Sequence, residues 1–129
     1  MKFVLREAKK VGIPTGMDDQ ISVGVDRKNY NFKLKEWIAI SEKYPVEELD
    51  PQVFAEEIKG VRVREGPIAD EQRIQQADLS YPIIIVKHAG GSNIVDGTHR
   101  IRKAMRLGVP VKARVIPFQD LASFKRGKK

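Results

Sequence analysis

The sequence predicts a single α+β domain with a mixed β-sheet, and three observations support this prediction. Between residues 82 and 116, apolar runs of strand length alternate with glycine-bearing turns and with one stretch of helical periodicity. That order of strand, hairpin, strand, helix and strand is typical of α+β domains. The chain of 129 residues has the usual length of one domain. Its 41% of hydrophobic and 32% of charged residues are typical of a folded, globular chain.

The first third of the chain predicts short strands. Phe3–Leu5 and Ile21–Val25 are apolar runs of strand length. Tyr30, Phe32 and Leu34 alternate with polar residues, which favours a half-buried strand. We expect these strands to lie ahead of the main domain.

A helix is predicted to start at Asp50. The Asp50 carboxylate supplies an acceptor at the cap, and Pro51 suits the first helical position. Gly60 would end this helix. The segment Glu71–Leu79 has helical spacing and predicts a second, short helix. In the first helix three apolar side chains would face inward: Val53, Phe54 and Ile58.

The clearest helix is Thr98–Leu107. Ile101, Ala104 and Met105 form an inward stripe, and Gly108 closes the helix. The elements around it are strands at Pro82–Lys87, Asn93–Val95 and Val111–Ile116, a turn at His88–Ser92 and a last short helix at Phe118–Phe124.

Three parts of the chain are therefore expected. Residues 1–36 would form an N-terminal extension of strands and residues 37–124 the main domain. Residues 125–129, KRGKK, would form a mobile basic tail that is not needed for folding.

Composition excludes several classes of site. The chain has no cysteine, so it has no disulfide, no thiol nucleophile and no cysteine-ligated metal. Its longest apolar run, Ile83–Val86, is far shorter than the roughly 20 residues of a membrane helix. The N-terminus lacks the apolar stretch of a signal peptide. We therefore expect a cytoplasmic protein with no membrane partner.

The charge is unevenly distributed along the chain. Residues 1–78 carry 13 basic and 15 acidic groups, whereas residues 79–129 carry 11 basic and 2 acidic groups. A net charge of −2 is thus followed by one of +9, which predicts an anionic partner for the second half, either a nucleotide or DNA. The alternative is a soluble surface with a lysine-rich tail.

The start of the Thr98–Leu107 helix has the chemistry of an anion site. Gly97 allows a sharp turn after Asp96, and the first N–H groups of a helix have no partner inside it. Thr98, His99 and Arg100 add a hydroxyl, an imidazole and a guanidinium at the same place. The alternative is a capped amphipathic helix whose remaining cations, Arg102, Lys103 and Arg106, form a solvated basic face.

The stretch YPIIIVKHAGGSNIVDGTHRIRKAMRLGVPVKARVI resembles the core of the ParB/sulfiredoxin superfamily. The shared features are a strand ending near a lysine, a glycine-bearing hairpin, a DGxHR-type turn opening a helix, and a returning strand. The upstream segment YPVEELDP is similar to the one that precedes the first helix in these domains. The resemblance covers roughly Trp37 to Ile116 and implies one ParB/sulfiredoxin-like domain with a phosphate-binding strand-turn-helix.

The resemblance also implies roles for individual residues. Nucleotide phosphates would be held by Gly97, Thr98, His99 and Arg100, and by Lys87 from the preceding strand. Thr98 stands where sulfiredoxins have their catalytic cysteine, so sulfinic-acid reduction by that route is excluded.

The turn Ile94–Arg100 also resembles that of the ADP-dependent free serine kinases. A further similarity to these kinases is the segment containing Pro45, Glu47 and Leu49, which implies that Glu47 is the base on a hydroxyl group.

Two functional hypotheses follow. The first is a nucleotide-dependent phosphotransferase or hydrolase. It would bind ATP, ADP or CTP, with Glu47, Asp96 and His99 as catalytic residues and Mg²⁺ on Asp96. A variant of it is a regulator that binds nucleotide without catalysis.

The second hypothesis is a DNA-binding protein, for instance a nuclease, that uses the basic second half of the chain. Its binding residues would be Arg102, Lys103, Arg106, Lys125 and Arg126. Steep salt dependence would distinguish it from a nucleotide enzyme.

Overall fold

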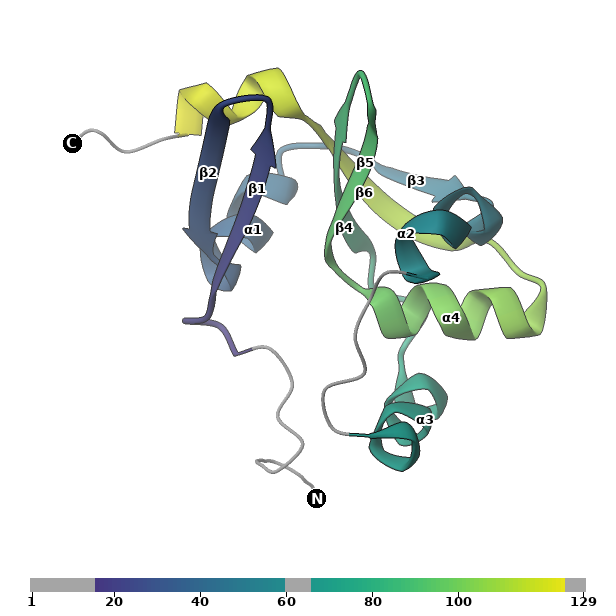
Figure 1. Cartoon of the computed structure of the whole chain (residues 1–129). Helices are drawn as coiled ribbons and strands as arrows, with labels where there is room; N and C mark the ends of the chain where they lie inside the picture. Colours follow the sequence, from purple (N-terminus) through teal and green to yellow (C-terminus); the bar gives the residue numbers. More distant parts are fainter. Residues whose placement is uncertain (1–15, 60–65, 125–129) are drawn as a thin grey trace.

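A computed structural model describes residues 16–59 and 66–124 of the chain. Its centre is a four-stranded sheet in the order β3-β6-β4-β5 (Figure 1). The strands are β3 (Val46–Leu49), β4 (Ile83–His88), β5 (Gly91–Asp96) and β6 (Val111–Pro117). β4 runs parallel to β6, while β3–β6 and β4–β5 are antiparallel. The predicted α+β class with a mixed sheet is confirmed.

The central strand β4 is buried on both faces of the sheet. Ile84 and Val86 point into a first core, which also contains Val95, Ile116 and Leu121. Ile83 and Ile85 point into a second core on the other face of the sheet. The remaining members of this core are Phe54, Ile58, Ile101, Ala104, Val111 and Ala113. The apolar run IIIV has no alternation because both faces of this strand are covered.

The first core is covered by the N-terminal hairpin and by a helix. β1 (Gln20–Val25) and β2 (Lys28–Lys33) form a separate two-stranded sheet, which α1 (Leu34–Ser41) follows directly. Trp37 of α1 is fully buried, and its Nε1 donates to the carbonyl of Ile21 at 2.9 Å. The hairpin is therefore part of the core. Leu34, expected in a strand, begins the helix instead.

The second core is covered by α4 (Thr98–Leu107) together with the 3₁₀ helix η1 (Pro51–Phe54) and α2 (Ala55–Lys59). Asp50 caps η1 as predicted, because its Oδ1 accepts from the N–H of Gln52 at 2.9 Å. Phe54 and Ile58 are buried as expected. Val53 is 63% exposed, so the expectation that it faces inward was wrong. The short 3₁₀ turn rotates it away from the face that Phe54 occupies.

The remaining elements are α3 (Pro67–Gln76) and the 3₁₀ helix η2 (Phe118–Phe124). In Figure 1, α3 lies beside α4 and away from the sheet. The predicted bounds of α4 and η2 are confirmed, whereas the helix expected from Glu71 begins at Pro67 and ends at Gln76. The expected strand Phe3–Leu5, the helix end at Gly60 and the tail 125–129 lie outside the described residues.

Candidate functional site

The turn between β5 and α4 requires glycine at its centre. Gly97 has a φ of 120°, in a region that other residues rarely adopt. A Cβ at this position would lie 2.3 Å from Cγ2 of Ile83 at the start of β4. The predicted strand-to-helix turn is confirmed. The glycine serves close packing against Ile83, a reason that the sequence did not reveal.

The N-terminus of α4 lacks a protein cap. Gly97 brings no side chain, the first turn contains no acid, and the first bond of the helix runs from Ile101 N to Gly97 O at 3.0 Å. The N–H groups of Thr98, His99 and Arg100 precede that bond, so they have no carbonyl inside the helix. Together with the helix dipole they favour a negatively charged group at this point.

Arg100 holds this turn in place. Its NH1 donates to the carbonyl of Pro82 at 2.7 Å and to that of Tyr81 at 3.4 Å, and its NH2 donates to Asp96 Oδ2 at 3.2 Å. The Arg100 side chain is 20% exposed. Three of its five N–H donors are therefore used within the described residues. Sequence reasoning predicted a phosphate ligand and missed this structural role.

His99 is paired with an acid that sequence reasoning overlooked. Its Nε2 lies 2.8 Å from Oδ1 of Asp70, in the first turn of α3. Oδ2 of the same carboxylate accepts from Arg102 NH1 at 3.0 Å. Asp70 thus contacts two side chains of α4 that are three residues apart and lie on one face of the helix. The signal in the sequence was only an acid near the start of a predicted helix.

The cations on the basic face of α4 pair with α3, whereas the alternative interpretation of the sequence left them free in solvent. Arg106 nevertheless stays 51% exposed. Lys103 Nζ donates to the carbonyls of Gln75 and Ala77, both at 2.8 Å. Arg106 makes two hydrogen bonds of 2.6 Å to Glu71. Hydrogen bonds from Arg106 and then Gln75 lower the pKa of Glu71 to about 2. The bond to Glu71 also raises the pKa of Arg106. Acids of the first half of the chain thus neutralise cations of the second.

Lys87 lies at the wrong end of the hairpin to join this site. It pairs with Ser92 beside the β4–β5 turn, whereas Gly97 lies at the other end of β5. The five residues from Ser92 to Gly97 span about 16 Å of extended strand. The structure therefore does not place Lys87 beside the start of α4.

Glu47 is also remote from the helix start. It lies exposed on the edge strand β3, and β6 and β4 separate that strand from β5. Three strand spacings amount to about 14 Å. The structure therefore brings Asp96, His99 and Arg100 together but leaves Glu47 outside. Lys125 and Arg126 lie outside the described residues.

The helix start offers no metal site of its own. Within residues 16–59 and 66–124 no three His, Asp or Glu side chains lie close enough to hold an ion. Asp96 beside the turn is bound to Arg100, and Asp70 is bound to His99 and Arg102.

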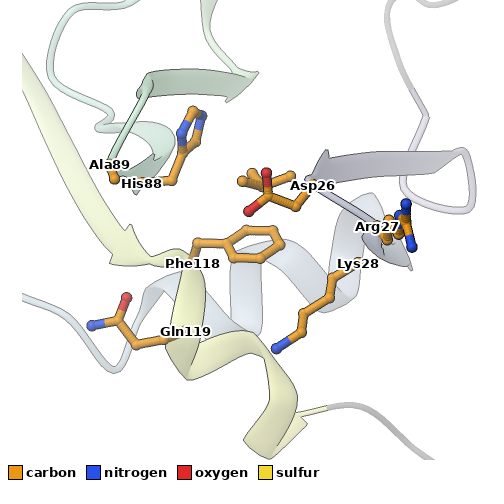
Figure 2. Close-up of a pocket in the computed structure, with 8 residues that line it drawn as sticks. Asp26, Arg27, Lys28, His88, Ala89, Phe118 and Gln119 are labelled. Carbon is orange, nitrogen blue, oxygen red and sulfur yellow. The ribbon is translucent and has the colours of Figure 1, made fainter.

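A separate cavity of about 490 Å³ lies at the opposite end of the β4–β5 hairpin. Figure 2 shows its lining, in which Phe118 lies among residues of two hairpin turns, including Asp26 and His88. His88 is fixed there, because its Nδ1 accepts from Gly90 N at 3.1 Å and its Nε2 lies 2.8 Å from Asn93 Oδ1. This cavity contains none of the residues that the sequence predicted for a site.

Comparisons with known proteins give one match. No protein-family model matches the chain, and no curated protein is similar to it. The sulfiredoxin from Arabidopsis thaliana is a solved structure that matches with 17% identity and a TM-score of 0.39, over 64% of this chain and 98% of that one. At this level the likeness carries no information about activity.

No helix among the described residues is long and apolar enough to cross a membrane.

Proposed function

We propose that this domain binds the phosphates of a nucleotide (ATP, ADP or CTP) at the N-terminus of α4 and transfers the terminal phosphoryl group to water or a hydroxyl. The observation that carries the proposal is an uncapped ten-residue helix that follows an obligatory glycine. Its free N–H groups and dipole favour an anion. Thr98 adds a hydroxyl in the first turn, and Arg100 retains two donors beyond those that hold the turn.

The surrounding electrostatics favour a small anion over a long polyanion. A nucleic-acid surface needs several solvent-exposed cations that track a phosphate backbone. Arg102, Lys103 and Arg106 are instead bound to Asp70, to two carbonyls and to Glu71. A nucleotide needs only the helix end. Its Mg²⁺ would be bound by phosphates and water, because the described residues supply no free acid cluster there.

The test is a titration of the full chain with ATP, ADP and CTP, with and without Mg²⁺. We expect amide resonances of Thr98, His99 and Arg100 to shift most in two-dimensional NMR spectra. A nucleotide at 100 times its Kd should also stabilise the fold by about 2.7 kcal/mol. Shifts centred elsewhere, or no binding by any of the three nucleotides, would contradict the proposal.

A further inference from the structure

Asp70 holds the imidazole of His99 in a defined orientation. The side chains of His99 and Asp70 are 31% and 18% exposed, and Nε2 lies 2.8 Å from Oδ1. Arg102 binds the second oxygen of the same carboxylate at 3.0 Å. The Asp70 carboxylate therefore has one polar partner on each oxygen, and a carboxylate accepts hydrogen bonds and donates none.

This arrangement determines which nitrogen of His99 is free. An ionised Asp70 takes the Nε2–H as donor, so a neutral ring carries its lone pair on Nδ1. Among the described residues Nδ1 makes no hydrogen bond. A carboxylate that fixes a histidine through one nitrogen and leaves the other free as a base is the arrangement of catalytic triads.

Other bonds besides this pair also hold α3 on α4. Arg106 and Glu71 are joined by two hydrogen bonds, and Lys103 binds the carbonyls of Gln75 and Ala77 at the end of α3. The Asp70–His99 contact differs from these bonds because it also fixes the orientation of an imidazole. It places an oriented imidazole beside the N-terminus of α4.

We propose that His99 is the general base of the phosphoryl transfer, in place of Glu47, and that Asp70 is the residue that positions it. This inference rests on the proposed function. Nδ1 of His99 takes the proton of the attacking water or hydroxyl as the oxygen forms its bond to the terminal phosphorus. The anhydride P–O bond breaks, and its electron pair leaves with the nucleoside phosphate. The imidazolium then releases the proton to solvent, so no other reactant is needed.

Three variants of the full chain test this proposal by hydrolysis of ATP and CTP with Mg²⁺. His99→Gln retains an N–H donor for Asp70 but cannot accept a proton. Asp70→Asn offers His99 an amide whose N–H can donate to Nε2. The proton of the neutral ring then lies on Nδ1, which can no longer act as a base. Glu71→Gln is the control, because it weakens the same interface between α3 and α4 one residue away without touching His99.

We expect kcat to fall about 100-fold or more in His99→Gln, the usual contribution of a general base. In Asp70→Asn kcat should fall at least about tenfold while nucleotide Kd changes by less than about threefold. Glu71→Gln should keep the wild-type kcat. An unchanged kcat in His99→Gln would overturn the proposal even if Asp70→Asn does not fold. Equal losses in Asp70→Asn and Glu71→Gln would also overturn it.

The two proposals fail in different ways. If the wild-type chain binds no nucleotide, the proposed function itself is wrong. If it binds ATP or CTP at the helix start but hydrolyses neither, or does so equally well in His99→Gln, phosphate binding stands and the assigned base is wrong.

Discussion

Gly97 and Ile83 lie so close together that no other residue fits at position 97. A Cβ there would lie 2.3 Å from Cγ2 and 2.7 Å from Cβ of Ile83, far inside van der Waals contact. Ile83 is fully buried at the start of β4 and cannot move without disturbing the core. The packing of these two residues sets where β5 ends and where α4 points its N–H groups.

Gly97→Ala should therefore destabilise the protein strongly. Overpacking costs about 1–3 kcal/mol and a strained backbone of this kind costs a similar amount, so we expect a loss of about 2–6 kcal/mol. Urea denaturation measures it. Gly108→Ala is the matched control, because Gly108 also has a positive φ, of 67°, but open space around its Cβ position. It should cost about 1–2 kcal/mol. Equal losses would show that packing against Ile83 plays no part.

Acid should abolish the contribution of the Glu71 carboxylate to the stability of the fold. Its pKa is lowered to about 2 in the folded protein by hydrogen bonds from Arg106 and Gln75, so the ionised form stabilises the fold. That contribution is present above pH 4.5, the unperturbed value, and is lost as pH falls toward 2. Urea denaturation of the wild type and of Glu71→Gln should therefore differ at pH 6 and converge near pH 2.

The control variant for this pH-dependent denaturation experiment is Glu48→Gln. Glu48 is exposed on β3 and makes no ion pair within the described residues. If the wild type is still more stable than Glu71→Gln at pH 2, the stabilisation does not come from the ionised form of Glu71.

Alkali should act on Tyr44. Burial, and then the hydrogen bond from its hydroxyl to Asp120 Oδ2 at 2.8 Å, raise the pKa of Tyr44 to about 12. The fold favours the neutral phenol, so this contribution is complete below pH 10 and is lost as pH rises toward 12. Tyr44→Phe should cost about 1–2 kcal/mol at pH 7. In denaturation experiments at increasing pH, the stability difference between the wild type and Tyr44→Phe should shrink above pH 10. A difference that stays constant would contradict this prediction.

The bonds between the cations of α4 and helix α3 predict a specific result for DNA binding. Arg106 is bound to Glu71 through NH1 and NH2, so Glu71 competes with a phosphate for this guanidinium. Arg106→Gln should leave the salt slope of any DNA binding unchanged. Removal of residues 125–129, which carry four cations, should flatten that slope by about 0.9 for each phosphate that these cations neutralise. A slope reduced by about 0.9 in Arg106→Gln would show that Arg106 contacts a DNA phosphate and would contradict this prediction.

The sequence predicted the elements whose ends have local chemical causes. α4 begins after Gly97 and ends at Gly108, and both glycines have the positive φ that marks such positions. The apolar run at Pro82–Lys87 predicted a strand, and β4 is observed at Ile83–His88 with both faces buried. β3 was missed because its side chains at Val46, Glu47 and Glu48 are exposed, and its pairing with β6 leaves no periodic pattern.

The site could be predicted only where its residues are neighbours in sequence. Asp96 to Arg100 form one turn, so the motif placed them together. Asp70 and His99 are 29 residues apart, and no local rule says which acid meets which base across two helices. The role of Lys87 came from the family resemblance. The sequence predicted a turn over His88–Ser92, whereas in the structure β5 begins at Gly91 and sets Lys87 opposite Ser92.

The central claim is that phosphate binds the N-terminus of α4, and Thr98→Asp tests it most directly. The first turn of α4 contains no acid, so a carboxylate there should interact favourably with the helix dipole and stabilise the fold by about 0.3–1 kcal/mol. The same negative charge should repel nucleotide phosphates and weaken their binding at least about tenfold. Thr98→Ser is the control and should change neither quantity. Thermal melts and nucleotide titrations of the same samples should therefore move in opposite directions, with the fold more stable and binding weaker. Unchanged nucleotide affinity in a stabilised Thr98→Asp would contradict the claim.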